Sequence, residues 1–218
     1  MQAEQDTPFV REKATAMGPY LVSDAPPHYL SAVEFSDIPE MVRVVNINKD
    51  IFNGTASFQY PYTEDHAHAR ISRAVGYTTN LGYNTHWVMR TSPDGPLIGW
   101  IHAYFNTKVN EVHPETGRPL KICEIGYWVS PEYVGKGYGS RSAQFVTHEI
   151  MFKEFGCDIV RADAFVDNKG SRTILENIGM VCEVESITEF IPKFQEQRVI
   201  CCYAVHRSEA TQTIKARP

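Results

Sequence analysis

The segment Val134–Ser140 (V-G-K-G-Y-G-S) alternates three glycines with other residues, between a strand-like run and a helix-like run. Alternate glycines allow several backbone N–H groups to converge on one anion. The first N–H groups of the following helix have no intrahelical acceptor, and the helix dipole adds about half a positive charge. The segment therefore predicts a pyrophosphate site, to which Lys136 can add one charge; the alternative is a flexible turn.

Two better-known phosphate-binding motifs do not fit this segment. A P-loop has the pattern G-x-x-x-x-G-K-[ST], whereas Lys136 stands between two glycines and is not followed by Ser or Thr. A dinucleotide-binding fingerprint has the pattern G-x-G-x-x-G, and the run from Gly135 to Gly139 is one residue short of it. The glycines therefore indicate an anion site of another type.

One acidic residue stands inside the strand-like run before the glycines. Alternation along a strand places Glu124 on the same side as Ile122, Gly126 and Trp128. A carboxylate among apolar neighbours costs free energy unless it is paired or takes part in function. We therefore expect Glu124 to be either a functional group or a residue in an ion pair or at a sheet edge.

Other polar residues have more local explanations. Asn168 precedes a helix expected from Lys169 and can cap it, while Ser171 lies in its first turn. His66 and His68 are two residues apart, so on a helix their rings point to different sides and cannot chelate one metal ion. The sequence predicts no metal site.

Periodicity and turn signals predict the elements that position these residues. Strands are expected at about 29–35, 85–91, 97–105, 120–129, 159–165, 181–190 and 198–205, and helices at about 38–49, 63–75, 140–155 and 169–178. The order β-α-α-β-β-β-α-β-α-β-β predicts an α/β fold, with a central, mostly antiparallel twisted sheet and helices on both faces. We expect an N-terminal arm over residues 1–27, one domain over 28–206 and a flexible tail over 207–218.

Composition limits the class of protein. A formal net charge of -5 provides no basic face for a nucleic acid and no polybasic run for an anionic membrane. The sequence has no apolar run of the ~18 residues that span a bilayer, and its five cysteines form no C-x-x-C pair. These features favour buried thiols in a cytoplasmic protein.

Two segments carry a resemblance to a known family. Residues 134–139 resemble the motif Q/R-x-x-G-x-G/A of the GNAT superfamily of N-acetyltransferases, with Val134 as a departure from Gln or Arg. The preceding run 124–129 (E-I-G-Y-W-V) looks like the Rim-type branch, which includes ribosomal-protein N-acetyltransferases. Residues 168–180 are similar to the family's N-x-x-S-x-x-x-L-x-x-x-G-[FM]. The resemblance covers about residues 29–205.

The resemblance implies acetyl-CoA as cosubstrate and transfer of acetyl to a primary amine of a small molecule, an amino acid or a protein N-terminus. It implies a general-base role for Glu124, directly or through water, and makes Ser171 a candidate proton donor to the CoA thiolate. The residues expected to contact the cofactor are Trp128, Val129, Val134, Gly135, Lys136, Gly137, Tyr138, Gly139, Ser140, Asn168 and Ser171.

The resemblance also implies that the acceptor binds at the loop Phe52–Tyr62 and at a hairpin near residues 191–197. Aromatic residues in that loop suggest a partly apolar pocket, although ring content is also ordinary in packing; with Glu124, the expected acceptor-binding residues are Phe58, Tyr60 and Tyr62. Two alternatives stay open: a non-catalytic acyl-CoA-binding module, and a detoxifying or O-acetylating enzyme with a different acceptor. The sequence is compatible with a monomer or a homodimer.

Overall fold

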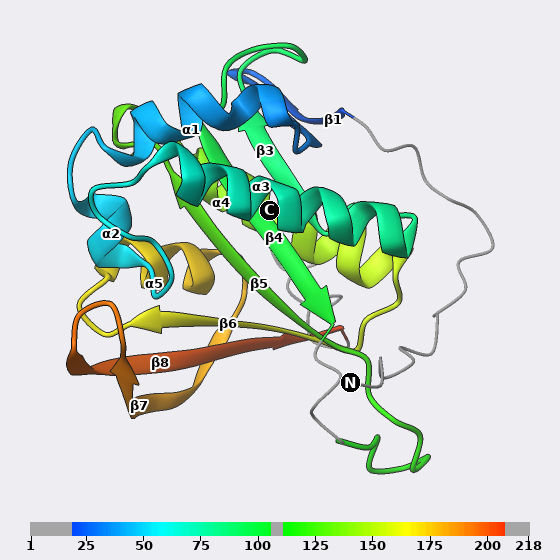
Figure 1. Ribbon diagram of the computed structural model, residues 1–218. Coiled ribbons are helices and arrows are strands. Elements are labelled where there is room, and N and C mark those ends of the chain that lie inside the picture. Colours follow the sequence, from blue (N-terminus) through cyan, green and yellow to red (C-terminus); the bar gives the residue numbers. More distant parts are fainter. Residues whose placement is uncertain (1–18, 106–110, 208–218) are drawn as a thin grey trace.

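A computed structural model describes residues 19–105 and 111–207 of the chain. The strands are β1 Tyr20–Asp24, β2 Pro27–Ala32, β3 His86–Arg90, β4 Gly99–Phe105, β5 Ile122–Val129, β6 Ile159–Phe165, β7 Val181–Ile191 and β8 Glu196–His206. They form one sheet in the order β1-β2-β3-β4-β5-β6-β8-β7 (Figure 1). Neighbours run antiparallel except β5 and β6, which are parallel. The predicted mixed, mostly antiparallel sheet is confirmed.

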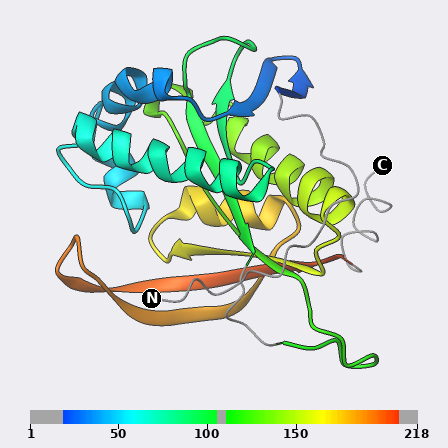
Figure 2. The same cartoon turned by 45° about the vertical axis from the view of Figure 1, so that its right-hand side comes forward.

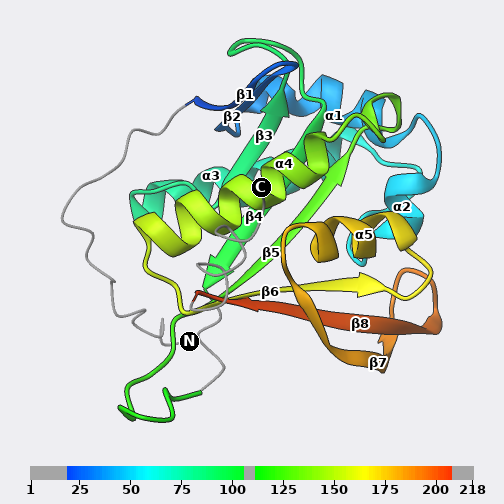
Figure 3. The same cartoon turned by 180° about the vertical axis from the view of Figure 1, so that it is seen from behind.

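Helices cover both faces of the sheet, as the sequence predicts. On the face seen in Figure 1 lie α1 (Ile38–Val45), α2 (Asp50–Gly54) and α3 (Glu64–Leu81). The opposite face, seen in Figure 3, carries α4 (Tyr138–Phe145) and α5 (Lys169–Asn177). A separate apolar core fills each interface. The helix expected at 140–155 begins as α4 and continues as a π-helical stretch over Val146–Glu154.

The N-terminal part of the described chain differs from the expectation. Residues 20–24, placed in a surface arm, instead form the edge strand β1. Its residues alternate so that Tyr20 and Val22 pack against the core while Leu21 is exposed. Residues 1–18 of the expected arm and 208–218 of the expected tail lie outside the described residues.

The helix α3 is longer than the pattern suggests. Its first turn is capped by Thr63, whose hydroxyl accepts a hydrogen bond from the His66 N–H. It ends only where Gly82 adopts a left-handed φ of 72°. The extra length places Tyr77 beside His86 and Tyr104 of the sheet.

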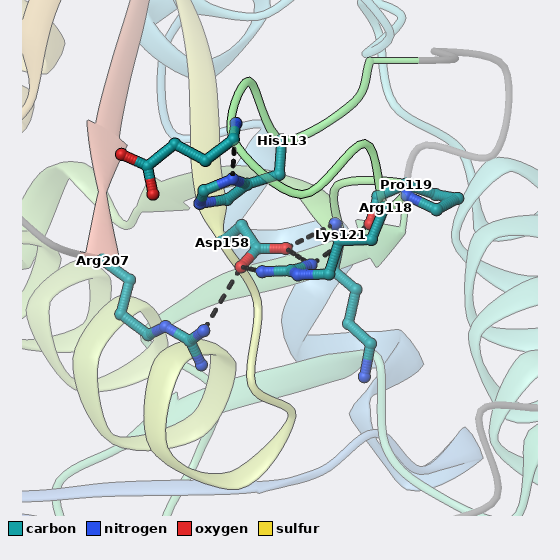
Figure 4. Close-up of polar contacts among 7 residues, drawn as sticks. His113, Arg118, Pro119, Lys121, Asp158 and Arg207 are labelled. Carbon is teal, nitrogen blue, oxygen red and sulfur yellow. Dashed lines mark hydrogen bonds and ion pairs between the residues drawn. The ribbon is translucent and has the colours of Figure 1, made fainter.

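A polar cluster fixes the end of the sheet where β5 and β6 meet (Figure 4). The Asp158 carboxylate accepts hydrogen bonds from Arg118 Nη1 at 2.8 Å and Nη2 at 2.6 Å, from the Lys121 N–H at 2.9 Å, and from Arg207 at 3.2 Å. The Arg118 hydrogen bonds lower the pKa of Asp158 to about 2. Asp158 therefore ties the segment before β5, the start of β6 and the end of β8 together.

The five cysteines are free thiols, of which Cys123, Cys157 and Cys201 are buried and Cys182 and Cys202 are half-buried. The expectation of buried thiols therefore holds fully for three of them. Within the described part of the chain, no helix combines the length and the apolar character needed to cross a bilayer.

Candidate active site

The site begins where β5 and β6 separate. Their parallel pairing covers Ile122 to Glu124 of β5 and stops at the pair Glu124↔Arg161. Beyond it β5 continues to pair with β4 as far as Val129, and β6 continues to pair with β8. Figures 1 and 2 show the two strands meeting at one end and diverging toward the other. The β5 main chain that follows Glu124 therefore has no ladder partner on its β6 side.

The glycine segment begins α4 without a side-chain cap. Gly135 and Gly137 adopt left-handed φ values of 78° and 81°, which residues with a Cβ rarely adopt. Gly137 is the N-cap residue, and the first helical hydrogen bond runs from the Arg141 N–H to its carbonyl at 3.1 Å. The N–H groups at the start of α4 have no helical acceptor, so they are available to an anion.

A single cavity of about 930 Å³ joins the glycine segment to the diverging strands. Its wall includes the ends of β5 and β6, the first residues of α5, and residues 54–58 after α2. Ten of the expected cofactor residues line it: Trp128, Val129, Val134, Gly135, Gly137, Tyr138, Gly139, Ser140, Asn168 and Ser171. The first and the last of these residues are 43 positions apart in the chain, and the fold brings the set into one wall.

The side chains of two expected cofactor residues have partners elsewhere in the protein. Lys136 is absent from the cavity wall, because its ammonium lies over the Tyr133 ring, 4.8 Å from the centroid. The Tyr138 ring is buried and packs edge-on against His28. Tyr138 therefore offers the cavity mainly its backbone.

At the start of α5, a serine hydroxyl lies beside a tyrosine hydroxyl of β5. Asn168 caps the helix by accepting from the Ser171 N–H at 3.1 Å, and it donates to the Gly54 carbonyl at 3.2 Å. The Ser171 hydroxyl lies 3.1 Å from the hydroxyl of Tyr127 on β5. Burial raises the pKa of Tyr127, so this phenol is protonated at neutral pH. Tyr127 also lines the cavity, and the motif comparison did not single it out.

Glu124 does not occupy the surroundings that alternation suggested. The side chain is exposed, and it is not part of the cavity wall. It sits at the last β5–β6 pair, opposite Tyr104 of β4 and Arg161 of β6. The expectation of a carboxylate among apolar neighbours was wrong, because polar side chains of the neighbouring strands share this end of the face.

The aromatic loop contributes less to the cavity than expected. Phe58 lines it, with its ring packed against Trp128 at a centroid distance of 5.6 Å. Tyr62 is buried in the core between the sheet and α1, and its hydroxyl points to the Met41 sulfur. Tyr60 is exposed, beside Phe52. Neither tyrosine belongs to the cavity wall, so two of these three acceptor predictions are not supported.

Two further polar residues line the cavity from elements that the sequence predicted, although no motif pointed to the residues themselves. Arg70 of α3 donates to the Ser57 hydroxyl at 3.1 Å, and its guanidinium lies over the Phe58 ring. His102 of β4 lies directly over Gly126 of β5. A glycine inside a strand marks a close approach of another group. Gly126 was therefore the sequence signal that a side chain of a neighbouring strand lies over β5 at this point.

The two histidines that the sequence excluded as ligands of one metal ion form other contacts. The His66 ring accepts from the Thr63 N–H at 3.1 Å, and His68 lies 3.3 Å from the Ser72 hydroxyl. Across residues 19–105 and 111–207, no group of three His, Cys, Asp or Glu side chains could hold a metal ion.

Comparison with known proteins agrees with this geometry. The family model described as an acetyltransferase (GNAT) domain matches residues 29–181, which is more than half of the chain. An FsC-acetyl coenzyme A-N(2)-transacetylase of Aspergillus fumigatus is 29% identical over 126 residues, covering 57% of this chain and 50% of the relative. The chain therefore matches about half the length of that curated relative.

Solved structures share the fold. Mycobacterium smegmatis RimJ in complex with CoA-disulfide superposes with a TM-score of 0.68 at 17% identity, covering 91% of this chain and 93% of that one. Spermidine N-acetyltransferase of Vibrio cholerae, in complex with CoA and spermine, has a TM-score of 0.63 at 16% identity, covering 84% and 98%. Rim-type acetyltransferases are thus among the structural neighbours.

Proposed function

The chain belongs to the GNAT acetyltransferase family, and from that premise we propose that it transfers the acetyl group of acetyl-CoA to a primary amine. The observation that carries the proposal is a cavity of about 930 Å³, which connects a helix start without a side-chain cap to a stretch of β5 that has no partner on its β6 side. A phosphate group and an amide-bearing arm of one ligand need these two features side by side.

The residues present fit acetyl-CoA. The free N–H groups at the start of α4 suit its pyrophosphate, with Gly135 and Gly137 allowing the turn. The unpaired β5 main chain between Gly126 and Val129 suits the pantetheine amides, which can replace β6 as a hydrogen-bonding partner. Bound there, acetyl-CoA supplies an activated thioester to an amine that enters on the α1–α3 side of the sheet.

We assign the proton delivered to the CoA sulfur to the hydroxyl pair of Ser171 and Tyr127. Both residues line the cavity and their hydroxyls lie 3.1 Å apart, so a proton given up by Ser171 can be replaced by Tyr127. A base role for Glu124 would have to operate through water, because its carboxylate is exposed and outside the cavity wall.

Two observations support a class of acceptor: the side chains in the cavity wall and the names of similar proteins. Phe58 and Arg70 in the wall give it a mixed apolar and polar character. Relatives include a transacetylase named for an N(2) position and an enzyme named for spermidine. We therefore place this chain's acceptor among primary amines of small molecules or protein N-termini. The free thiols support a reducing compartment, such as the cytoplasm, as the place of the reaction.

The test has a binding arm and a turnover arm. Thermal melting with acetyl-CoA, CoA and NADH should show stabilisation by the first two and none by NADH. Thiol release from acetyl-CoA is then measured with spermidine, lysine and a peptide with a free N-terminal amine. Turnover with one of them supports the proposal; CoA binding without any turnover would favour a non-catalytic acyl-CoA-binding module.

A further inference from the structure

We propose that His102 is the catalytic residue that takes the proton from the acceptor amine during acetyl transfer. The inference rests on the proposed function and deepens it by naming a group that neither the motifs nor the family match assigns. Two observations carry it: the position of the imidazole over Gly126, and its place in the cavity wall.

The imidazole occupies the space that a side chain at position 126 would fill. A Cβ added to Gly126 would lie 2.6 Å from His102 Cε1 and 2.7 Å from Nε2, distances that real Cβ atoms essentially never show. His102 and Gly126 are direct partners in the β4–β5 pairing. Gly126 comes two residues after Glu124, where the β5–β6 pairing stops. The ring therefore reaches from β4 across β5 to the point where the sheet opens.

The ring nitrogens of His102 are available for chemistry, in contrast to those of the neighbouring His86. His86 is held on both sides, with Nδ1 2.8 Å from the Thr85 hydroxyl and Nε2 2.5 Å from the Tyr104 hydroxyl. Within the part of the chain that the structure describes, no hydrogen bond is formed by either ring nitrogen of His102; its neighbours are the rings of His86 and Tyr104.

The surroundings keep the imidazole neutral. His86 faces it from β3, Tyr104 from β4, and Arg70 from α3; Glu124 lies farther along the face, on β5. Burial, together with the smaller effect of the positive charge of Arg70, lowers the pKa of His102 to about 4. At neutral pH the ring can therefore accept a proton.

The lone pair of the neutral amine forms a C–N bond with the thioester carbonyl carbon, and the C=O electron pair moves to oxygen. The nitrogen becomes far more acidic once it is bonded to this carbon, so a weakly basic imidazole can take its N–H proton. The C=O bond then re-forms, and the C–S bond breaks with its electron pair on sulfur. The sulfur is protonated to give the CoA thiol, and the imidazolium returns its proton to water.

The experiment compares His102→Ala, Glu124→Gln and a matched control, His206→Gln, in full-length protein with the panel amine that wild type acetylates fastest. His206 is exposed at the end of β8, paired with Glu183, and is absent from the cavity wall. General acid–base groups contribute about 10²–10⁴-fold. We therefore expect His102→Ala to lower kcat by about 100-fold or more, with the KM for acetyl-CoA and the CoA-induced melting shift unchanged.

Added imidazole provides the readout that a packing role would not move. His102→Ala leaves a space over Gly126, so imidazole should restore part of its kcat while leaving wild type and His206→Gln unaffected after subtraction of uncatalysed acetylation. Full activity in His102→Ala, or a loss that imidazole does not restore, would overturn the inference; so would a large loss confined to Glu124→Gln. Wild type that binds CoA but acetylates no amine would instead contradict the proposed function, and this inference with it.

Discussion

A single substitution can place a negative charge at the start of α4, where the pyrophosphate is proposed to bind. Ser140 lies in the first turn of α4 and lines the cavity. Ser140→Asp adds a carboxylate there, and Ser140→Asn is its neutral match in size. A negative charge at a helix N-terminus stabilises the helix by about 0.3–1 kcal/mol. We therefore expect the ligand-free Asp variant to melt at or above the temperature of the Asn variant.

The same carboxylate should oppose the cofactor. At about 5 Å from one phosphate charge, and with an effective dielectric constant of ~20, the repulsion is roughly 3 kcal/mol, which weakens binding about 100-fold. Acetyl-CoA at about 100 times its wild-type Kd adds ~2.7 kcal/mol of stability, or roughly 5–11 °C of Tm in a domain of this size. The same concentration should raise the Tm of Ser140→Asp by only about 1 °C.

The assay is therefore a melting curve of each variant with and without acetyl-CoA. Opposite effects of one substitution on the free and the bound protein are the expected signature: equal or higher stability alone, and loss of the ligand shift. If Ser140→Asp kept the shift of Ser140→Asn, the pyrophosphate would not lie at this helix start. The reasoning from the uncapped N–H groups would then be refuted.

Three further outcomes follow from single contacts. Tyr127→Phe removes one of the two paired hydroxyls, so steady-state kinetics should show kcat about tenfold lower or more with the KM for acetyl-CoA little changed. Arg118 lowers the pKa of Asp158, so this group's stabilisation should be present above pH ~4 and lost as pH falls toward 2; Asp158→Asn should remove that dependence in urea titrations and cost about 1–2 kcal/mol at pH 7. Arg90→Met leaves Asp37 buried without its 2.8 Å ion pair, which should cost about 3–5 kcal/mol at pH 7 and less as the pH falls, because burial raises the pKa of Asp37 and favours its neutral form.

Local signals in the sequence were sufficient to single out the glycine segment and the start of α5, which line the cavity. The alternate glycines lie next to the helix that they begin, and the cap residue Asn168 lies next to α5, so each signal is local; periodicity located the strands on either side. The element order predicted the sheet because each long element had its own apolar pattern. The edge strand β1 was missed because a five-residue run between Gly18-Pro19 and Pro26-Pro27 carries too little pattern.

The residues expected to bind the acceptor depend on contacts between distant elements, and there the sequence was less informative. Tyr62 belongs to the core with α1, although its neighbour Phe58 reaches the cavity. Alternation correctly placed Glu124 on one side of β5, yet it could not show that this end of the face is exposed. His102 had no motif of its own; its position depends on which residue of β5 lies opposite it.

The register between β4 and β5 therefore decides whether the site has an imidazole. Side chains alternate along a strand, so a shift of one residue would replace His102 at Gly126 by Ile101 or Ala103, both now buried on the other face. Each diverging strand is held by its outer partner, β5 by β4 and β6 by β8, so the opening does not depend on the two strands separating on binding. Parallel strands need a crossover, and that crossover starts α4 at the carboxyl end of β5. The crossover thus places the start of α4 and the β5 main chain that lacks a β6 partner at one opening, and the β4–β5 register adds the imidazole to it.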